Sequence, residues 1–272
     1  MSAPAGTQGT LRRYAGLAVL LTGVGLRRLV SYRADFLVGV GAFALRVVLH
    51  ALLLGVIYRH VTDIAGWTFR EAVLLLGVAM LVRGLDHAFT DQLWELGRKL
   101  VQRGELVRYL VRPVHPLFSL LSERFCYPEG IGEAVAGLAV IGYAAGGLDL
   151  DLDPTRIAVF AVLLVAGTLV LAAVKLLLAA LAFWTTTSLQ VMTAVYELAD
   201  TARYPLDVFP WPARLLLTSL LPFALTGFVP ADHLLHGPSG LSWLAVPISV
   251  ALTLLALRVW ALGVRRFEAV GP

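Results

Sequence analysis

Long apolar stretches, separated by short polar ones, recur along most of this chain and leave it few possible folds. A helix that crosses a bilayer needs about 20 mostly apolar residues, and six stretches meet or approach that length. They cover residues 36–58, 71–90, 130–148, 155–183, 184–203 and 241–263. Only 15% of the 272 residues are charged and 58% are hydrophobic, whereas a soluble domain has about a quarter charged residues. We therefore predict an all-α integral membrane protein in which residues 36–272 form one transmembrane domain with six helices.

The N-terminal residues 1–35 contain a shorter apolar stretch. Its uncharged core, residues 14–26, is too short to cross the hydrocarbon layer, and arginine pairs flank it on both sides. We predict a cytoplasmic tail followed by a helix that lies in the membrane interface. A short additional span is the alternative.

Residues 91–129, here called the basic segment, are the longest polar stretch between apolar runs. Leucines and valines of this segment fall on one side of a helical wheel, and most of its charged residues fall on the other. Gly104 is expected to divide the helix, and Pro113 and Pro116 are expected to end it. The pattern indicates a cytoplasmic segment that lies against the membrane and receives a soluble partner. A basic loop that only follows the topology rule is the alternative.

Charged residues inside the predicted spans need partners. Arg46 and His50 share one face of the first span, and a central arginine that faces lipid costs at least about 2.5 kcal/mol on insertion scales. This face should therefore point at other helices or at a wet cavity. Arg83 and Asp86 in the second span are three residues apart, so we expect them to pair with each other.

The fifth span is the least apolar. Gln190, Thr193 and Glu197 lie on one face of it, together with Thr186 and Asp200. Such a face cannot point at lipid, so it either packs on other helices or lines a route for polar cargo. The candidate residues for a translocation path are therefore Arg46, His50, Gln190, Thr193 and Glu197.

The later part of the sequence contains features that predict a helix start, a hairpin and close packing of helices. Asp153 and Pro154 are typical of an N-cap and first turn, and they should open the fourth span. Residues 205–230 are interrupted by Pro222 and predict a re-entrant hairpin on the outer side, followed by a polar loop over residues 231–241. The third span contains several glycines, which favour close approach of a neighbouring helix.

Metal and nucleotide sites are not expected in this chain. Asp149, Asp151 and Asp153 lack the glycine and the distal glutamate of a calcium loop, and His233 and His236 lack further zinc ligands. The phosphate-loop pattern Gly-x-x-x-x-Gly-Lys-[Ser/Thr], Gly-x-Ser-x-Gly and His-Glu-x-x-His are all missing from the sequence. We predict no catalytic, cofactor-binding or metal-binding residue.

Arginines and lysines outside the spans are concentrated on one side of the predicted topology. The positive-inside rule then places both termini and the basic segment in the cytoplasm. Basic residues are not interleaved with exposed aromatic residues in a polar domain, so a nucleic-acid partner is not expected.

Several short motifs resemble those of the ABC-2 type permeases, the membrane subunits of ATP-binding-cassette exporters, and in particular a bacterial multidrug-type subfamily. They are Arg103-Gly-Glu-Leu, Leu110-Val-Arg-Pro-Val-His-Pro, Tyr204-Pro-Leu and the tail Trp260-Ala-Leu-Gly-Val-Arg-Arg-Phe-Glu-Ala-Val-Gly. The layout of an interfacial helix, six spans and a hairpin before the last span is similar too. The tail departs from the pattern at Phe267, where a tyrosine is expected.

The resemblance implies a non-catalytic permease subunit in the bacterial cytoplasmic membrane. It would work with a separate ATPase dimer, which binds ATP and Mg²⁺, and with a second copy or a related permease. The substrate would be hydrophobic, cationic or lipid-like. The coupling helix would lie in the basic segment, whose candidate residues are Arg98, Lys99, Arg103, Glu105, Arg108 and Arg112.

Two other functions remain open from the residues. An ion-coupled carrier would use Arg46, Asp86 and Glu197 as coupling charges. An integral membrane enzyme would depend on His50 or His87.

Overall fold

The computed structural model describes residues 14, 16–25, 27 and 33–270, of which residues 33–40, 42–44, 46–47 and 268–270 are described as backbone only. These residues are helical apart from turns and an isolated bridge between Ile64 and Trp67, and no strand occurs among them. The all-α prediction is therefore confirmed. The longer helices are α2 (Arg33–Tyr58), α3 (Phe69–Thr90), α7 (Pro128–Ala145), α8 (Pro154–Ala180), α9 (Ser188–Leu198) and α12 (Gly240–Val270).

Three stretches of the described chain are long and apolar enough to cross a membrane. They are Phe69–Thr90, Pro154–Phe183 and Gly240–Phe267. Their length and composition support a membrane protein. The six-span layout remains a prediction.

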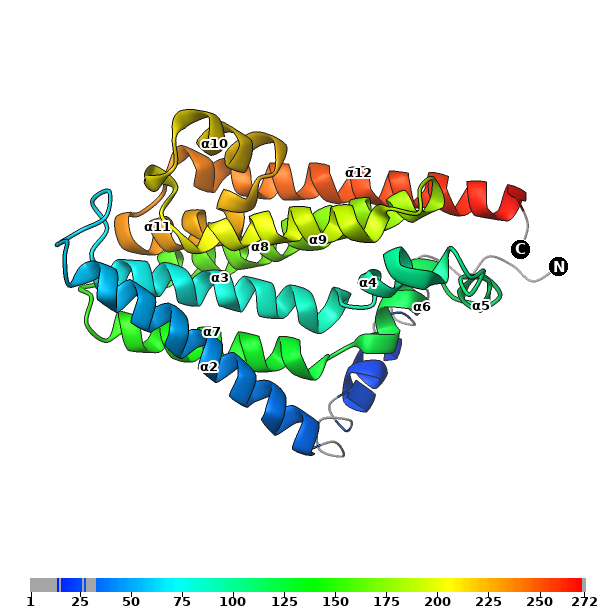
Figure 1. Cartoon of the computed structure of the whole chain (residues 1–272), viewed down its shortest axis with the longest axis horizontal. Coiled ribbons are helices and arrows are strands. Elements are labelled where there is room, and N and C mark those ends of the chain that lie inside the picture. The colour runs from blue at the N-terminus through cyan, green and yellow to red at the C-terminus, as the bar shows by residue number, and fades with distance from the viewer. Residues whose placement is uncertain (1–13, 15, 26, 28–32, 271–272) are drawn as a thin grey trace.

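The helices run lengthwise side by side, and the polar connections gather at two opposite ends (Figure 1). The short helices α4 (Leu93–Glu95), α5 (Val107–Leu110) and α6 (Pro116–Leu121) lie at one end, together with the last turns of α12. The loop after α2, the turn before α8 and α11 (Phe228–His236) lie at the other end. The basic segment is therefore separated from the loops of the opposite end by the length of the bundle.

Local sequence accounts for several helix starts. The Asp153 carboxylate accepts a hydrogen bond from the Thr155 backbone N–H at 3.0 Å, and Pro154 occupies the first turn of α8, as predicted. At the start of α3, the Glu71 carboxylate accepts hydrogen bonds from the backbone N–H and the hydroxyl of Thr68. Proline also stands in the first turn of α6 and α7, where its missing N–H costs nothing.

Glycines bring α3 and α7 into backbone contact. A Cβ on Gly84 would overlap the backbone of Ala134, and a Cβ on Gly137 would lie 2.6 Å from the backbone nitrogen of Leu81. Gly142, one turn and a half further along α7, has no heavy atom within 4 Å of its would-be Cβ. The glycine-rich third span thus supports close helix packing at Gly137 but not at Gly142.

The region before α12 differs from the prediction. Residues 231–241 are not a polar loop, because α11 continues to His236 and residues 237–239 alone connect it to α12. Val229, Ala231 and Leu234 are buried on the bundle, so α11 packs against it. The hairpin region consists of short helical pieces. They are 3₁₀ turns at Leu206–Val208 and Phe223–Thr226, the α-helix α10 (Trp211–Leu215) and a π-helical turn at Leu216–Leu220.

The fifth predicted span is only partly α-helical. Its α-helix, α9, has 11 residues and continues as a 3₁₀ turn over Ala199–Arg203. At about 1.5 Å per residue, α9 alone is too short to cross the hydrocarbon layer.

Candidate functional site

The basic segment folds into several short helical pieces rather than one helix. A π-helical turn, Leu96–Leu100, follows α4, and the chain then reverses at Gly104, whose φ of +70° lies in the left-handed region. The Leu106 N–H donates to the Leu100 carbonyl at 3.0 Å and closes this reversal. Gly104 therefore divides the segment as predicted.

Glu95 joins the two ends of the basic segment. Its carboxylate is buried and lies 3.4 Å from Arg98, 3.3 Å from Lys99 and 3.4 Å from Arg124. Arg124 also donates to Asp91 at 2.7 Å. Each partly exposed pair contributes only about 0–1 kcal/mol, but the shared Glu95 carboxylate fixes α4 to the residues that precede α7.

Glu123 forms a second anion centre on the same surface. Tyr109 donates to its carboxylate at 2.7 Å, while Arg108 and Arg112 lie 3.5 Å and 3.3 Å from it. Gln92 donates to Glu123 at 3.2 Å. Burial, reinforced by the hydrogen bond to Glu123, raises the pKa of the Tyr109 hydroxyl above its ordinary value, so this donor keeps its proton at neutral pH.

A polar hollow of about 260 Å³ lies between the two anion centres. Its lining residues come from both halves of the segment and are Gln92, Glu95, Lys99, Leu100, Arg108, Glu123 and Arg124. The hollow is at the same end of the bundle as the C-terminal turns of α12 (Figure 1).

The structure brings four of the six predicted coupling residues to these two centres. Arg98 and Lys99 lie at Glu95, and Arg108 and Arg112 lie at Glu123. Arg103, beside the Gly104 reversal, is exposed, and no ion pair joins it to any described residue. Glu105 is half-buried, and no ion pair joins it to any described residue either.

The basic segment is packed directly on α9. Gly97 faces Met192, so close that an added Cβ would lie 2.8 Å from the Met192 sulfur. The Ser188 hydroxyl donates to the Gly97 carbonyl at 3.2 Å, and the Trp94 ring meets the Tyr196 ring edge-on at 5.3 Å. The segment therefore contacts α9 without an intervening element.

Helix α9 also meets a buried ion pair. Lys175 Nζ in α8 lies 2.6 Å from Asp86 in α3, and both side chains are fully buried. Lys175 also donates to the Thr90 hydroxyl at 2.9 Å, and the Tyr196 hydroxyl donates to Asp86. The ammonium is 5.0 Å from the Tyr196 ring. This arrangement ties α3, α8 and α9 together in the apolar part of the bundle.

Arg83 and Asp86 do not pair with each other, so that prediction is wrong. Arg83 pairs with Asp200, which follows α9, and lies 3.9 Å from Glu133 in α7. The spacing permits a local pair, but Asp86 pairs with Lys175 from α8 and Arg83 pairs with a residue beyond the end of α9. His87 also reaches Glu133, at 3.1 Å.

The predicted path residues lie in two places. Gln190, Thr193 and Glu197 are exposed on the outer side of α9, away from the other helices of this chain. His50 lies inside the bundle and accepts a hydrogen bond from Arg203 at 3.1 Å. The side chain of Arg46 is outside the described residues.

Sequence reasoning missed Lys175 and Glu133. Each is a charged residue well inside a mainly apolar helix, and both are buried. An isolated charge within a span is itself a signal, because it needs a partner from another helix. The identity of that partner depends on the tertiary arrangement.

Cys126, the only cysteine of the chain, is expected to be inert in the folded protein. It is buried, and burial raises the pKa of its thiol, which lowers the reactive thiolate fraction. We expect a maleimide reagent to modify native Cys126 at least about tenfold more slowly than a cysteine placed at exposed Arg103 in Arg103→Cys. Mass spectrometry of membranes before and after unfolding measures both rates, and equal native rates would contradict the buried position.

The comparisons with known proteins agree with this architecture. The family model described as "ABC-2 family transporter protein" matches residues 44–271, from α2 to the end of α12. No match was found among curated proteins or among solved structures. Because the matched region covers most of the sequence, the chain belongs to the ABC-2 family of transporter proteins.

Proposed function

We propose that this chain is the transmembrane permease subunit of an ATP-driven exporter. Proteins of the ABC-2 family normally work with an ATP-binding-cassette ATPase, and the sequence has no phosphate-loop motif of its own. The observation that carries the proposal is the direct packing of the basic segment on α9, through Gly97 and Met192. This packing supports a mechanical role for the segment.

In this proposal the ATPase docks on the exposed cations of the basic segment. Arg98 and Arg108 have side chains that are 58% and 49% exposed, so they keep guanidinium surface available to acidic groups of a partner. Arg103 and Glu105 carry no internal ion pair within the described residues. ATP and Mg²⁺ bind to the partner chain and not to this subunit.

The movement is passed on through α9. A push at Gly97 displaces Ser188 and Met192 in the first half of α9. At the far end, Tyr196 bonds to Asp86 of one ion pair, and Asp200, just after α9, forms another with Arg83. Because these pairs also hold α3, α7 and α8, the helices move as coupled bodies. This supports alternating access driven from the cytoplasmic side.

The polar face of α9 supports a translocation path between two permease subunits. Gln190, Thr193 and Glu197 are exposed in the single chain, and such a face is unfavourable against lipid. A second copy or a related permease would cover it and enclose the route, with His50 and Arg46 on α2 as further candidates. The cargo would be hydrophobic, cationic or lipid-like. The proposed setting is the bacterial cytoplasmic membrane, with six spans and both termini inside.

The experiment is co-expression with the candidate ATPase, followed by co-purification and a vesicle transport assay. Arg103→Glu combined with Arg98→Gln and Lys99→Gln removes the docking cations without placing new negative charge beside Glu95. We expect ATP-dependent transport and ATPase co-purification to fall at least about tenfold, since several charge-assisted contacts are lost together. Membrane insertion should be unchanged.

The matched control is Arg59→Glu, which reverses an exposed cation at the opposite end of the bundle. It should keep transport near that of the natural sequence. Undiminished coupling in the triple variant would contradict the docking role. Transport that persists without ATP and collapses with a protonophore would instead favour the ion-coupled carrier.

A further inference from the structure

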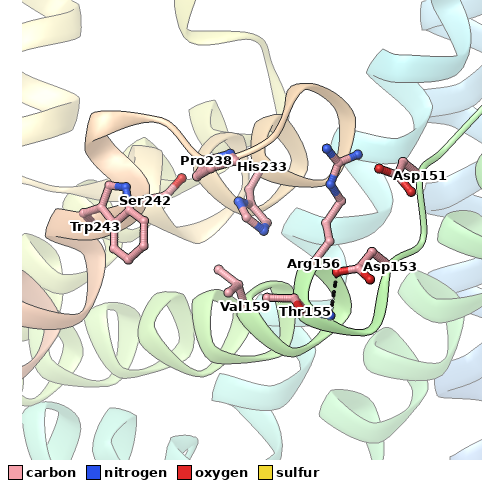
Figure 2. Close-up of a pocket in the computed structure, with 9 residues that line it drawn as sticks. All are labelled: Asp151, Asp153, Thr155, Arg156, Val159, His233, Pro238, Ser242 and Trp243. Carbon is pink, nitrogen blue, oxygen red and sulfur yellow. Dashed lines mark hydrogen bonds between the residues drawn. The ribbon is translucent and has the colours of Figure 1, made fainter.

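A partly enclosed cavity (Figure 2) is formed by elements at the end of the bundle opposite the basic segment (Figure 1). Its volume is about 330 Å³, and it lies among the turn before α8, the first turns of α8 and α12, and α11. Its lining includes Asp151, Asp153, Arg156, Val159, His233 and Trp243. The proposed transport cycle uses none of them.

His233 is buried inside this cavity without a hydrogen-bond partner. Its exposed fraction is 3%, and neither ring nitrogen has a partner among the described residues. Figure 2 shows the imidazole pointing from α11 into the space above Val159 of α8. A buried polar group left unpaired is unfavourable, so the ring favours a bound polar group in the cavity.

The charges around the cavity have both signs. Asp151 and Asp153 contribute carboxylates, and Arg156 contributes a guanidinium that stands between His233 and Asp151 (Figure 2). No ion pair within 4 Å joins Arg156 to either carboxylate. The Asp153 carboxylate caps α8 through one oxygen, Oδ2. An unpaired guanidinium suits a phosphate, and nearby carboxylates suit an ammonium group.

A second, apolar groove lies further along the same two helices. It has a volume of about 310 Å³ and lies between α8 and α12, lined by Ala161, Val162, Val165, Ala166, Leu169, Val246, Ser249 and Val250. Val162 follows Val159 by about one helical turn, and Val246 follows Trp243 likewise. The polar cavity therefore lies at one end of an apolar groove, and exposed Trp243 marks the boundary, as aromatic residues do at membrane interfaces.

We propose that cavity and groove together bind one phospholipid with an ethanolamine headgroup. Its phosphate lies at Arg156, its ammonium donates hydrogen bonds to Asp151 and Asp153, and His233 bonds the ester region. One acyl chain occupies the groove along Val165. A primary ammonium has N–H donors for the carboxylates, which a choline headgroup lacks, and a glycerol headgroup carries no cation.

The test is native mass spectrometry of the purified permease with equimolar phosphatidylethanolamine, phosphatidylglycerol and phosphatidylcholine. We expect the natural sequence to retain phosphatidylethanolamine about tenfold more than phosphatidylcholine, the scale of one charge-assisted contact. Asp151→Asn should reduce this preference, and Arg156→Gln should lower retention of all three lipids. Val165→Trp, which fills the groove, should lower retention without changing the preference.

Matched controls separate the site from general surface effects. Asp207→Asn removes an exposed carboxylate from the hairpin, where it pairs with Arg214, and Val135→Trp enlarges an exposed apolar residue of α7. Both should retain lipid as the natural sequence does. Soluble glycerophosphoethanolamine should bind far more weakly than the intact lipid.

Equal retention of the three lipids by the natural sequence would overturn the proposal. So would tight binding of soluble glycerophosphoethanolamine together with no effect of Val165→Trp, because the occupant would then be a headgroup alone. The measurement requires no ATPase. Its failure would leave the exporter proposal intact, and loss of ATPase coupling would leave lipid retention unchanged.

Discussion

Gly84→Ala is expected to lower the free energy of unfolding by about 3 kcal/mol, at the upper end of the usual cost of overpacking. A methyl group at this position overlaps the backbone of Ala134 in α7. A flexible side chain can rotate away from such an overlap, but a helix backbone cannot, so α3 and α7 must separate. Denaturant unfolding in detergent micelles, followed by tryptophan fluorescence, measures the change.

Gly142→Ala is the matched control for this prediction. The same chemical change is made on α7, but nothing lies within 4 Å of the new methyl group. Alanine also has a helix propensity about 1 kcal/mol better than that of glycine, so stability should stay equal or rise slightly. If both variants lost the same stability, the loss would belong to the glycine-rich helix in general and not to close packing at Gly84.

Lys175→Met is expected to destabilise the protein by about 3–5 kcal/mol, because it leaves Asp86 as a buried charge without its cation. Methionine fills a similar volume, so the change tests charge and not packing. Thr90 and Tyr196 still donate to Asp86, and they offset part of the loss. The same unfolding assay applies.

The double variant Lys175→Met with Asp86→Asn distinguishes an ion pair from other causes. The amide carries no charge; its oxygen accepts from one of the hydroxyls of Thr90 and Tyr196, and its NH2 group donates to the other, so most of the lost stability should return. A double variant as unstable as the sum of the two single variants would show that the two residues act independently. The interaction between Lys175 and Asp86 would then contribute nothing to the free energy of unfolding.

Local signals in the sequence predicted local features well. The Asp153 cap and the division of the basic segment at Gly104 depend on one or two residues and their backbone geometry, and both are confirmed. Apolar content alone indicated a membrane protein, and the family comparison agrees. Such features depend on the residues themselves and on their immediate sequence, so they can be predicted without knowledge of the tertiary contacts.

Features that depend on tertiary partners were predicted poorly. Arg83 and Asp86 are correctly spaced for a local pair. Arg83 pairs instead with Asp200 and Asp86 with Lys175, and both partners come from other helices. The stretch after residue 230 carries Asp232 and His233 and was predicted as a loop, yet buried apolar neighbours hold it as α11. The roles of the predicted coupling and path residues remain predictions.

The ion pairs between the helices have a consequence for the energetics of the membrane. In two groups they hold three cations, Arg83, Lys175 and Arg203, and three carboxylates, Asp86, Glu133 and Asp200. Moving one elementary charge across a membrane potential of 100 mV changes its electrical energy by about 2.3 kcal/mol. Because these six groups have no net charge when they move together, the membrane voltage does almost no work on them, and the subunit's rearrangement need not vary with how strongly the cell is polarised.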